Sequence, residues 1–215
     1  MEFNLQTYLT EMREELNGKL DKVVETTTDH ESRLAVIENT LGIERGHIET
    51  IHSYTNDQNL LDNYHSKYRR GRSAALNMVI TETGADKAVA KVLPALAGKL
   101  SGNAVRVPTP DVSLAILNLT LKKSTTKEGV NDIMKDAALR GSLVEQIQYS
   151  FSNELVSTDC IGNPCASIFD SPATIVAKDG KSVVLYVWYD NEYGYTRQVL
   201  RLAKHIAEVI RLTYY

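Results

Sequence analysis

The chain has 215 residues, 43% hydrophobic and 24% charged, which is ordinary globular composition with room for one full core plus an appendage. Its 24 basic and 27 acidic residues give a formal net charge of −3, which excludes a global field for holding nucleic acid or an anionic membrane, so any anion site must be local. Because only two cysteines occur and neither a membrane-spanning run nor a signal-like start is found, the sequence predicts a soluble, cytoplasmic protein.

Residues 1 to 41 are predicted to form a helical, coiled-coil-like segment. From Leu5 to Leu41 the apolar residues recur at spacings of three and four, close to a heptad pattern with one extra residue. The first 42 residues hold nine acidic and four basic side chains, a net charge of −5, which leaves +2 for the rest of the chain. Two different segments are therefore expected.

A break in this helix near residue 29 is equally compatible with the sequence. Thr28 and Glu31 fit a capping box, in which each side chain satisfies backbone groups at a helix start. His30 lies on the apolar seam, where a tolerated polar position is expected rather than a metal ligand, because no second ligand has suitable spacing. No metal site is predicted.

Residues 42 to 215 are predicted to form an α+β domain. Strands are expected at 47–54, 103–107, 113–122 and 182–188, and helices at 85–93, 127–139 and 196–212. A long polar connection follows the first strand through Arg72. Because strands and helices do not alternate strictly, the pattern favours a mixed, largely antiparallel sheet with helices on one face.

Five separated motifs follow one another in this second segment: "GIERGHIETIHSYTNDQNLLD", "RRGRSAALN", "TETGADKAVAKVLPALAGKL", "NAVRVPTPDVS" and "WYDNEYGY". In order and spacing they resemble the catalytic domain of phosphorylating glyceraldehyde-3-phosphate dehydrogenases, over about residues 42 to 212. The resemblance implies the fold of that domain. It also implies a mechanism in which a cysteine thiolate attacks an aldehyde, a histidine moves the proton, NAD accepts hydride and phosphate cleaves the thioester.

His52 is the candidate proton-transfer residue. It stands near the end of a predicted strand beside a polar loop, where an imidazole is suited to exchange a proton near neutral pH. Without the resemblance, a structural histidine is the favoured alternative. The resemblance assigns His52 the role of catalytic base and then acid.

Four further residues are candidates for phosphate binding. The resemblance assigns Thr55 and Arg106 to the substrate phosphate, and Thr83 with Gly84 to the attacking inorganic phosphate. Arginine offers a planar fork of donors, threonine adds a hydroxyl, and glycine lets the backbone approach an anion closely. The structural alternative is an arginine that caps a strand and a Thr-Gly turn before a helix.

The arginines at 69, 70 and 72 form a basic cluster without interleaved aromatic residues, which argues against nucleic-acid binding. The resemblance implies that their loop makes subunit contacts in a homo-oligomer.

The cofactor and nucleophile positions depart from the family pattern. Asn191 matches the residue that contacts the nicotinamide amide, but the glycine-rich turn of a dinucleotide-binding domain is missing, so this chain by itself is not expected to bind NAD. Glu25 occupies the position that the spacing selects for the nucleophile, and a carboxylate cannot form a thioester. Cys160 and Cys165 are expected to be ordinary thiols.

Two functions therefore remain open. The resemblance implies an oxidoreductase domain of an NAD-dependent phosphorylating glyceraldehyde-3-phosphate dehydrogenase of glycolysis, inactive as this chain. The alternative is a non-catalytic oligomerisation or interaction module that retains a pocket for phosphate or a small phosphorylated aldehyde. Neither nucleic acid nor a membrane is expected as a partner.

Overall fold

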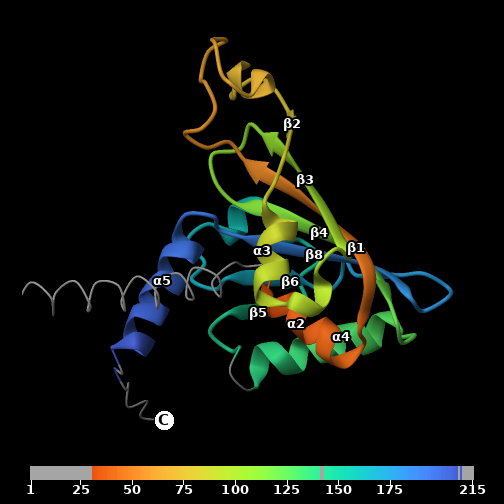
Figure 1. The fold of residues 1–215 in the computed structure, drawn as a ribbon. Coiled ribbons are helices and arrows are strands. Elements are labelled where there is room, and N and C mark those ends of the chain that lie inside the picture. The colour runs from red at the N-terminus through yellow and green to blue at the C-terminus, as the bar shows by residue number, and fades with distance from the viewer. Residues whose placement is uncertain (1–30, 141–142, 208, 210–215) are drawn as a thin grey trace, which may run out of the picture.

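The computed structural model describes residues 31–140, 143–207 and 209. These residues form one eight-stranded sheet and four α-helices (Figure 1). The helices are α2 (Glu31–Thr40), α3 (Ala85–Val92), α4 (Lys127–Leu139) and α5 (Tyr193–Ile206). The strands are β1 (Ile43–Ser53), β2 (Val79–Thr81), β3 (Leu100–Val107), β4 (Ser113–Leu121), β5 (Ile147–Ser150), β6 (Ser167–Asp170), β7 (Ile175–Val176) and β8 (Ser182–Tyr189).

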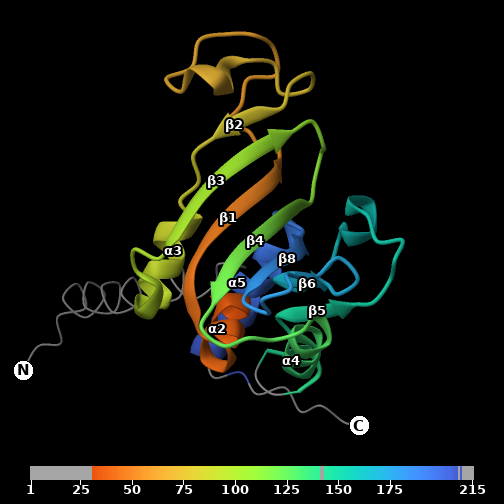
Figure 2. The ribbon, with the colours of Figure 1, turned by 90° about the vertical axis from the view of Figure 1, so that its right-hand side faces the viewer.

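The sheet is mixed and mostly antiparallel, as predicted. Its strand order is β2-β3-β1-β4-β8-β6-β5, and β7 pairs with β8. The pairs β1–β3 and β5–β6 are parallel, whereas the other pairs are antiparallel. Figure 2 shows the long strands β3, β1 and β4 side by side. The α+β fold class is therefore confirmed.

Several predicted helices and strands are present in the structure with nearly the expected bounds. The clearest example is α4, which was expected at 127–139 and spans Lys127–Leu139. It begins after Thr126, whose Oγ1 accepts a hydrogen bond of 3.1 Å from the backbone N–H of Gly129. This side-chain cap satisfies one of the N–H groups that a helix start leaves open. The short strands β2, β5, β6 and β7 were not predicted, because two to four residues are too few to show a period.

One hydrophobic core joins the sheet to α2, α3 and α4. From the helices it takes fully buried residues such as Ile37, Val89 and Met134, which pack with Ile48 and Leu117 of the sheet. Burial of such side chains is the main term that stabilises a fold of this size. The three helices thus share one face of the sheet, as predicted.

The predicted N-terminal segment is described only in its last part. Residues 31–40 are helical, and Leu34 and Ile37 of the apolar seam are buried in the core of the sheet domain. Gly42 then turns the chain into β1 with a φ of +71°, a backbone conformation that other residues rarely adopt. The seam before residue 31, the break near residue 29, His30 and Glu25 lie outside the described residues. The domain boundary at residue 41 stays a prediction.

The segment between β1 and β2 projects beyond the end of the sheet (Figures 1 and 2). It contains one 3₁₀ turn, Tyr68–Gly71. In the part of the chain that is described, no helix is long and apolar enough to cross a membrane.

Candidate functional site

Four strand ends meet at one edge of the sheet. Because β1 and β3 run parallel, their C-terminal ends lie together, and His52 pairs with Arg106. Because β4 is antiparallel to β1 and to β8, its first residue, Ser113, lies at the same edge opposite Tyr189, the last residue of β8. The turn after β8 adds Asn191. Side chains from distant parts of the sequence therefore converge here.

A cavity of about 730 Å³ opens at this edge. Five of the predicted site residues line it: His52, Thr83, Gly84, Arg106 and Asn191. Its other lining residues are Thr50, Lys67, Arg70, Glu82, Ala85, Lys87, Ala88, Ala104, Tyr189 and Tyr195. The sixth predicted residue, Thr55, is within reach, because Arg106 Nη1 donates to its Oγ1 at 3.4 Å. The structure brings all six together, while their roles stay predictions.

The contact between His52 and Arg106 is the central one. His52 Nδ1 lies 2.7 Å from the carbonyl oxygen of Ser53, and Arg106 Nη1 lies 2.9 Å from Nδ1 and 3.1 Å from the same oxygen. An unprotonated Nδ1 would accept from Nη1 but would face the Ser53 oxygen, another acceptor, at the shorter distance of 2.7 Å, whereas a protonated Nδ1 donates to that oxygen and Nη1 then donates to the same oxygen. We therefore assign the proton to Nδ1, which donates to Ser53, so that Nε2 is the acceptor.

His52 is neutral at physiological pH. Burial lowers its pKa most, the Ser53 carbonyl raises it, and the positive charge of Arg106 lowers it further, to about 4 from the ordinary 6.5. The ring of Tyr189 meets the imidazole edge to face, with centroids 6.2 Å apart. A neutral imidazole can accept a proton, and an anion placed beside it would raise its pKa.

Arg106 has unused capacity to bind an anion. Its Nε is buried and has no hydrogen-bond partner among the described residues, and the same holds for the hydroxyl of Thr50 on the neighbouring strand. Burial and the nearby charge of Arg70 lower the pKa of Arg106. Neither of these buried atoms is open to a ligand, but Arg106 Nη2 forms no hydrogen bond with a described residue, so it can donate to an anion that would also compensate the charge.

Sequence reasoning did not find Arg70. It was grouped with Arg69 and Arg72 as a subunit-contact residue, yet its side chain lines the cavity. Its Nε donates to Thr81 Oγ1 at 2.9 Å, and its Nη1 pairs with Asp57. Three arginines so close together carry no local signal that tells which guanidinium faces inward. The hydrogen bond to Thr81 on β2 is what directs the Arg70 side chain toward the cavity.

The start of α3 forms another wall of the cavity. Thr83 Oγ1 accepts a hydrogen bond of 3.2 Å from the backbone N–H of Ala85, and Gly84 is the N-cap residue. A Cβ added at Gly84 would meet no atom within 4 Å, so open space adjoins this backbone. The N-terminus of a helix carries partial positive charge and exposed N–H groups, which suits an anion.

Asn191 is held in a fixed orientation. Its Oδ1 accepts hydrogen bonds from Ser53 Oγ at 2.9 Å and from Ser113 Oγ at 3.0 Å. The buried carboxylate of Asp190 stabilises the turn by accepting from the backbone N–H of Tyr193. The side-chain NH₂ of Asn191 donates to Glu192 Oε1 at 3.5 Å, and its second N–H is left to donate to a ligand.

Neither cysteine lies at this cavity. Cys160 is buried, which raises the pKa of its thiol to about 12, and Cys165 lines a different groove, where burial also raises its pKa. Both are free thiols. Within the described ranges, no group of three or more histidine, cysteine or carboxylate side chains is arranged to hold a metal ion.

Comparison with known proteins gives consistent matches. The family model described as "Glyceraldehyde 3-phosphate dehydrogenase, C-terminal domain" matches residues 25–191. The match therefore begins inside residues 1–41, the segment predicted to be a helix separate from the α+β domain. A glyceraldehyde-3-phosphate dehydrogenase-like protein of Pseudomonas aeruginosa (strain UCBPP-PA14) is 52% identical over 196 residues, which are 89% of this chain and 42% of that protein. The glyceraldehyde-3-phosphate dehydrogenase of Priestia megaterium is 49% identical over 172 residues, 80% of this chain and 50% of that enzyme. The chain spans about half the length of these curated relatives.

We expect His52 to remain neutral down to about pH 4. In the unfolded chain His52 has its ordinary pKa of 6.5, so as the pH falls the unfolded chain binds a proton on this imidazole before the folded chain does. The free energy of unfolding therefore decreases as the pH falls from 6.5 to about 4. The loss is on the order of 3 kcal/mol, at about 1.4 kcal/mol per pKa unit. The measurements are an NMR titration of the imidazole signal, identified by its absence in His52→Gln, and urea unfolding at several pH values.

The His52→Gln variant should lose less stability than the parent between pH 6.5 and 4. His47→Gln on the same strand is the control, and it should leave the His52 signal unchanged, because His47 instead contacts Ser101 and Asn103. A pKa for His52 at or above its ordinary value would contradict the assignment.

Proposed function

The chain belongs to the glyceraldehyde-3-phosphate dehydrogenase C-terminal domain family, and we propose that it supplies the phosphate pocket and the proton-accepting histidine of a phosphorylating aldehyde dehydrogenase. The observation that carries this proposal is the His52–Arg106 pair. Strand register holds a neutral imidazole beside a guanidinium that has unused donors, and both line one cavity. Arg106 Nη1 lies 2.9 Å from His52 Nδ1, so a proton acceptor and an anion-binding group are adjacent. This arrangement suits a small substrate that has both a reacting carbonyl and a phosphate.

Two groups of donors would hold two phosphates. Arg106 with Thr55 forms the first, and the hydroxyl and backbone of Thr83 and Gly84 at the start of α3 form the second. Arg70 adds a further positive charge to the same cavity. The first group is proposed for the substrate phosphate and the second for the phosphate that attacks the thioester.

His52 would move the proton. With Nδ1–H bound to the Ser53 carbonyl, Nε2 can take the proton from a thiol as the sulfur attacks the aldehyde carbon, and return a proton later. A thiolate formed beside the imidazole raises the pKa of His52, so the low value of the empty pocket does not prevent the transfer. Cys160 and Cys165 do not line the cavity, so the thiol would come from elsewhere.

The described residues fit only the nicotinamide end of NAD. The NH₂ of Asn191, with its oxygen tied to Ser53 and Ser113, can donate to a carboxamide oxygen at the cavity. No glycine-rich phosphate turn occurs in the described ranges, so the pyrophosphate has no counterpart there. When bound, NAD accepts the hydride of the oxidation step.

We expect phosphate to bind this cavity weakly, in the millimolar range or about −4 kcal/mol, because exposed charge pairs contribute little and salt screens them. Arg106→Ala should abolish binding, whereas His52→Ala should barely change it. Arg72→Ala is a control, because that arginine instead pairs with Asp62 on the surface. The measurement is NMR titration with phosphate or glyceraldehyde 3-phosphate at low ionic strength.

The amides of Thr55 and Gly84 should shift in this titration, and well-dispersed amide spectra would show that each variant is folded. Stationary amides at these residues, or an Arg106→Ala variant that binds as the parent does, would show that the residue assignments are wrong.

We expect this chain by itself to produce no NADH from NAD, glyceraldehyde 3-phosphate and phosphate. Its two thiols lie away from the cavity, and its described residues offer only one end of the dinucleotide site. Absorbance of NADH is the measurement. Production that scales with purified protein and disappears in His52→Ala would overturn this expectation.

A second candidate function, assembly, is supported by the surface of the projecting segment. Its exposed apolar residues are Leu60, Leu61, Tyr64, Tyr68, Leu76 and Met78, and Ile80 of the adjoining strand β2 is exposed as well. Tyr68 and Leu76 are 85% and 82% exposed, and several large apolar side chains exposed in one short segment are typical of an interaction surface. We propose that a second copy of the chain covers this segment in a homo-oligomer.

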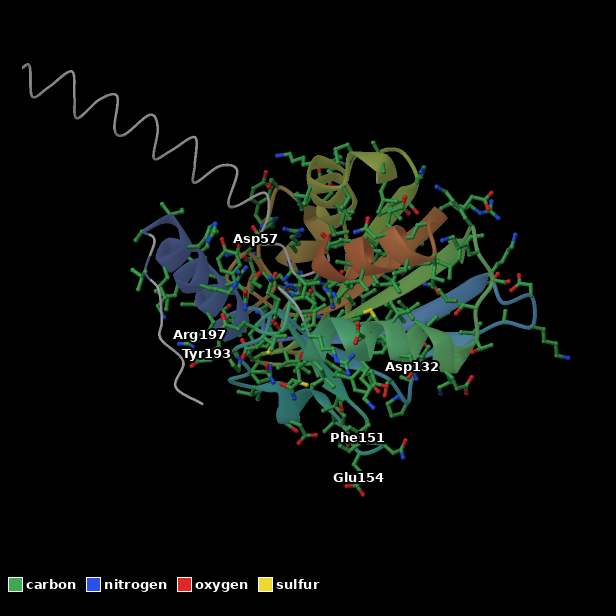
Figure 3. All side chains as sticks on the ribbon, turned by 90° about the horizontal axis from the view of Figure 1, so that it is seen from below. Asp57, Asp132, Phe151, Glu154, Tyr193 and Arg197 are labelled. Atoms are coloured by element: carbon green, nitrogen blue, oxygen red, sulfur yellow. The ribbon has the colours of Figure 1, made fainter. Side chains whose placement is uncertain are left out.

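Light scattering at micromolar concentration should therefore give at least a dimer. The double variant Tyr68→Glu, Leu76→Glu should shift the protein toward the monomer, because it charges the apolar surface without touching the core. Glu154→Gln, on an exposed loop at another end of the molecule (Figure 3), is the control. A parent protein that is monomeric under these conditions would rule out the assembly.

A further inference from the structure

A second cavity of about 440 Å³ lies between α5 and the two segments that contain Glu145 and Pro164. It shares no lining residue with the cavity at His52. Figure 3 shows Arg197, one of its lining residues, beside Tyr193 on α5. The proposed function does not use this groove.

One side of the groove is strongly basic. Arg197, Arg201, Lys204 and His205 of α5 all line it, at spacings that place them on one helix face. Glu145 is the one carboxylate among the lining residues. Arg197, Arg201 and Lys204 make no ion pair with any described residue, so their positive charge is available to a ligand.

Arg201 is positioned by a buried amide. Gln198 is 3% exposed, and its Nε2 donates to the carbonyl oxygen of Pro164 at 3.0 Å and to that of Glu145 at 3.4 Å. Its Oε1 accepts from Arg201 Nε at 2.8 Å. The two terminal nitrogens of Arg201 form no hydrogen bond within the described part of the chain. A fixed guanidinium has already lost rotamer freedom, so less is lost when a ligand binds.

The helix macrodipole does not account for this arrangement. Cations near a helix C-terminus are favourable, which explains Lys204 and His205 in the last turn of α5. Arg197 is the fifth residue of the same helix, too far from its C-terminus for the macrodipole to favour a cation there. The macrodipole also gives no reason for the contact between Gln198 and Arg201.

We propose that this groove binds a small organic phosphate, with Arg201 and Arg197 on the phosphate group. Two guanidinium groups supply planar forks of donors that match phosphate oxygens, and Lys204 adds a point charge. Pro164, Leu200 and Val209 provide apolar surface for the organic part. This combination of a few convergent charges with apolar walls is typical of a ligand site.

Phenyl phosphate, inorganic phosphate and phenol distinguish the two parts of this site. In an NMR titration, the amides of residues 197–204 should shift with phenyl phosphate, several-fold more weakly with inorganic phosphate, and not with phenol. If phenyl phosphate and inorganic phosphate bound equally well, the proposal that the apolar walls bind the organic group of the ligand would be wrong. Equal shifts with phenol would overturn the anion part, and amides that stay still would overturn both.

Two arginine variants separate this groove from the first cavity. Arg201→Ala should weaken phenyl phosphate binding at least about tenfold, as loss of an arginine–phosphate contact implies. Arg106→Ala should leave the α5 shifts unchanged. Arg201→Lys keeps the positive charge but loses the planar set of guanidinium donors, so this variant should also bind phenyl phosphate more weakly. It replaces the alanine variant in the test if Arg201→Ala is poorly folded. Undiminished binding by both Arg201 variants would refute the site.

Discussion

Parallel pairing of β1 with β3 is the constraint on which the candidate site depends. It sets His52 opposite Arg106 at the carboxyl ends of both strands. A guanidinium and an imidazole that touch in a partly buried place cannot both be charged without a large cost, and arginine keeps its proton in proteins. The histidine is therefore neutral, and the remaining donors of the arginine face a cavity where an anion would compensate the charge.

The neighbouring antiparallel strands complete this arrangement. The start of β4 and the end of β8 reach the same edge, so Ser113 and the turn at Asn191 join residues from β1 and β3. His52, Arg106 and Ser113 are held by backbone hydrogen bonds of the sheet, and Thr55, Thr83 and Asn191 lie just beyond the ends of β1, β2 and β8. Rigid elements of this kind preorganise a site, because little conformational freedom is left to lose when a ligand binds.

The two cavities use different means to position an arginine. Strand register and the carbonyl of Ser53 position Arg106, whereas the buried amide of Gln198 positions Arg201. In both places a guanidinium keeps donors that no described residue uses. The first cavity combines this donor set with a proton acceptor, which suits chemistry. The second combines basic side chains with apolar walls, which suits binding.

The family, the α+β class, the bounds of α4 and the six candidate site residues could be predicted from the amino-acid order, because motifs and periodicity are local properties of a few neighbouring residues. The remaining features depend on contacts that form only in the folded chain. Leu34 and Ile37 could have packed on another helix as well as on the sheet, since an apolar stripe does not specify its partner. Arg70 turns inward because Thr81 and Asp57 lie beside it, and Gln198 holds Arg201 because α5 packs against Pro164. Such contacts join residues far apart in the chain, and only the folded arrangement brings them within reach.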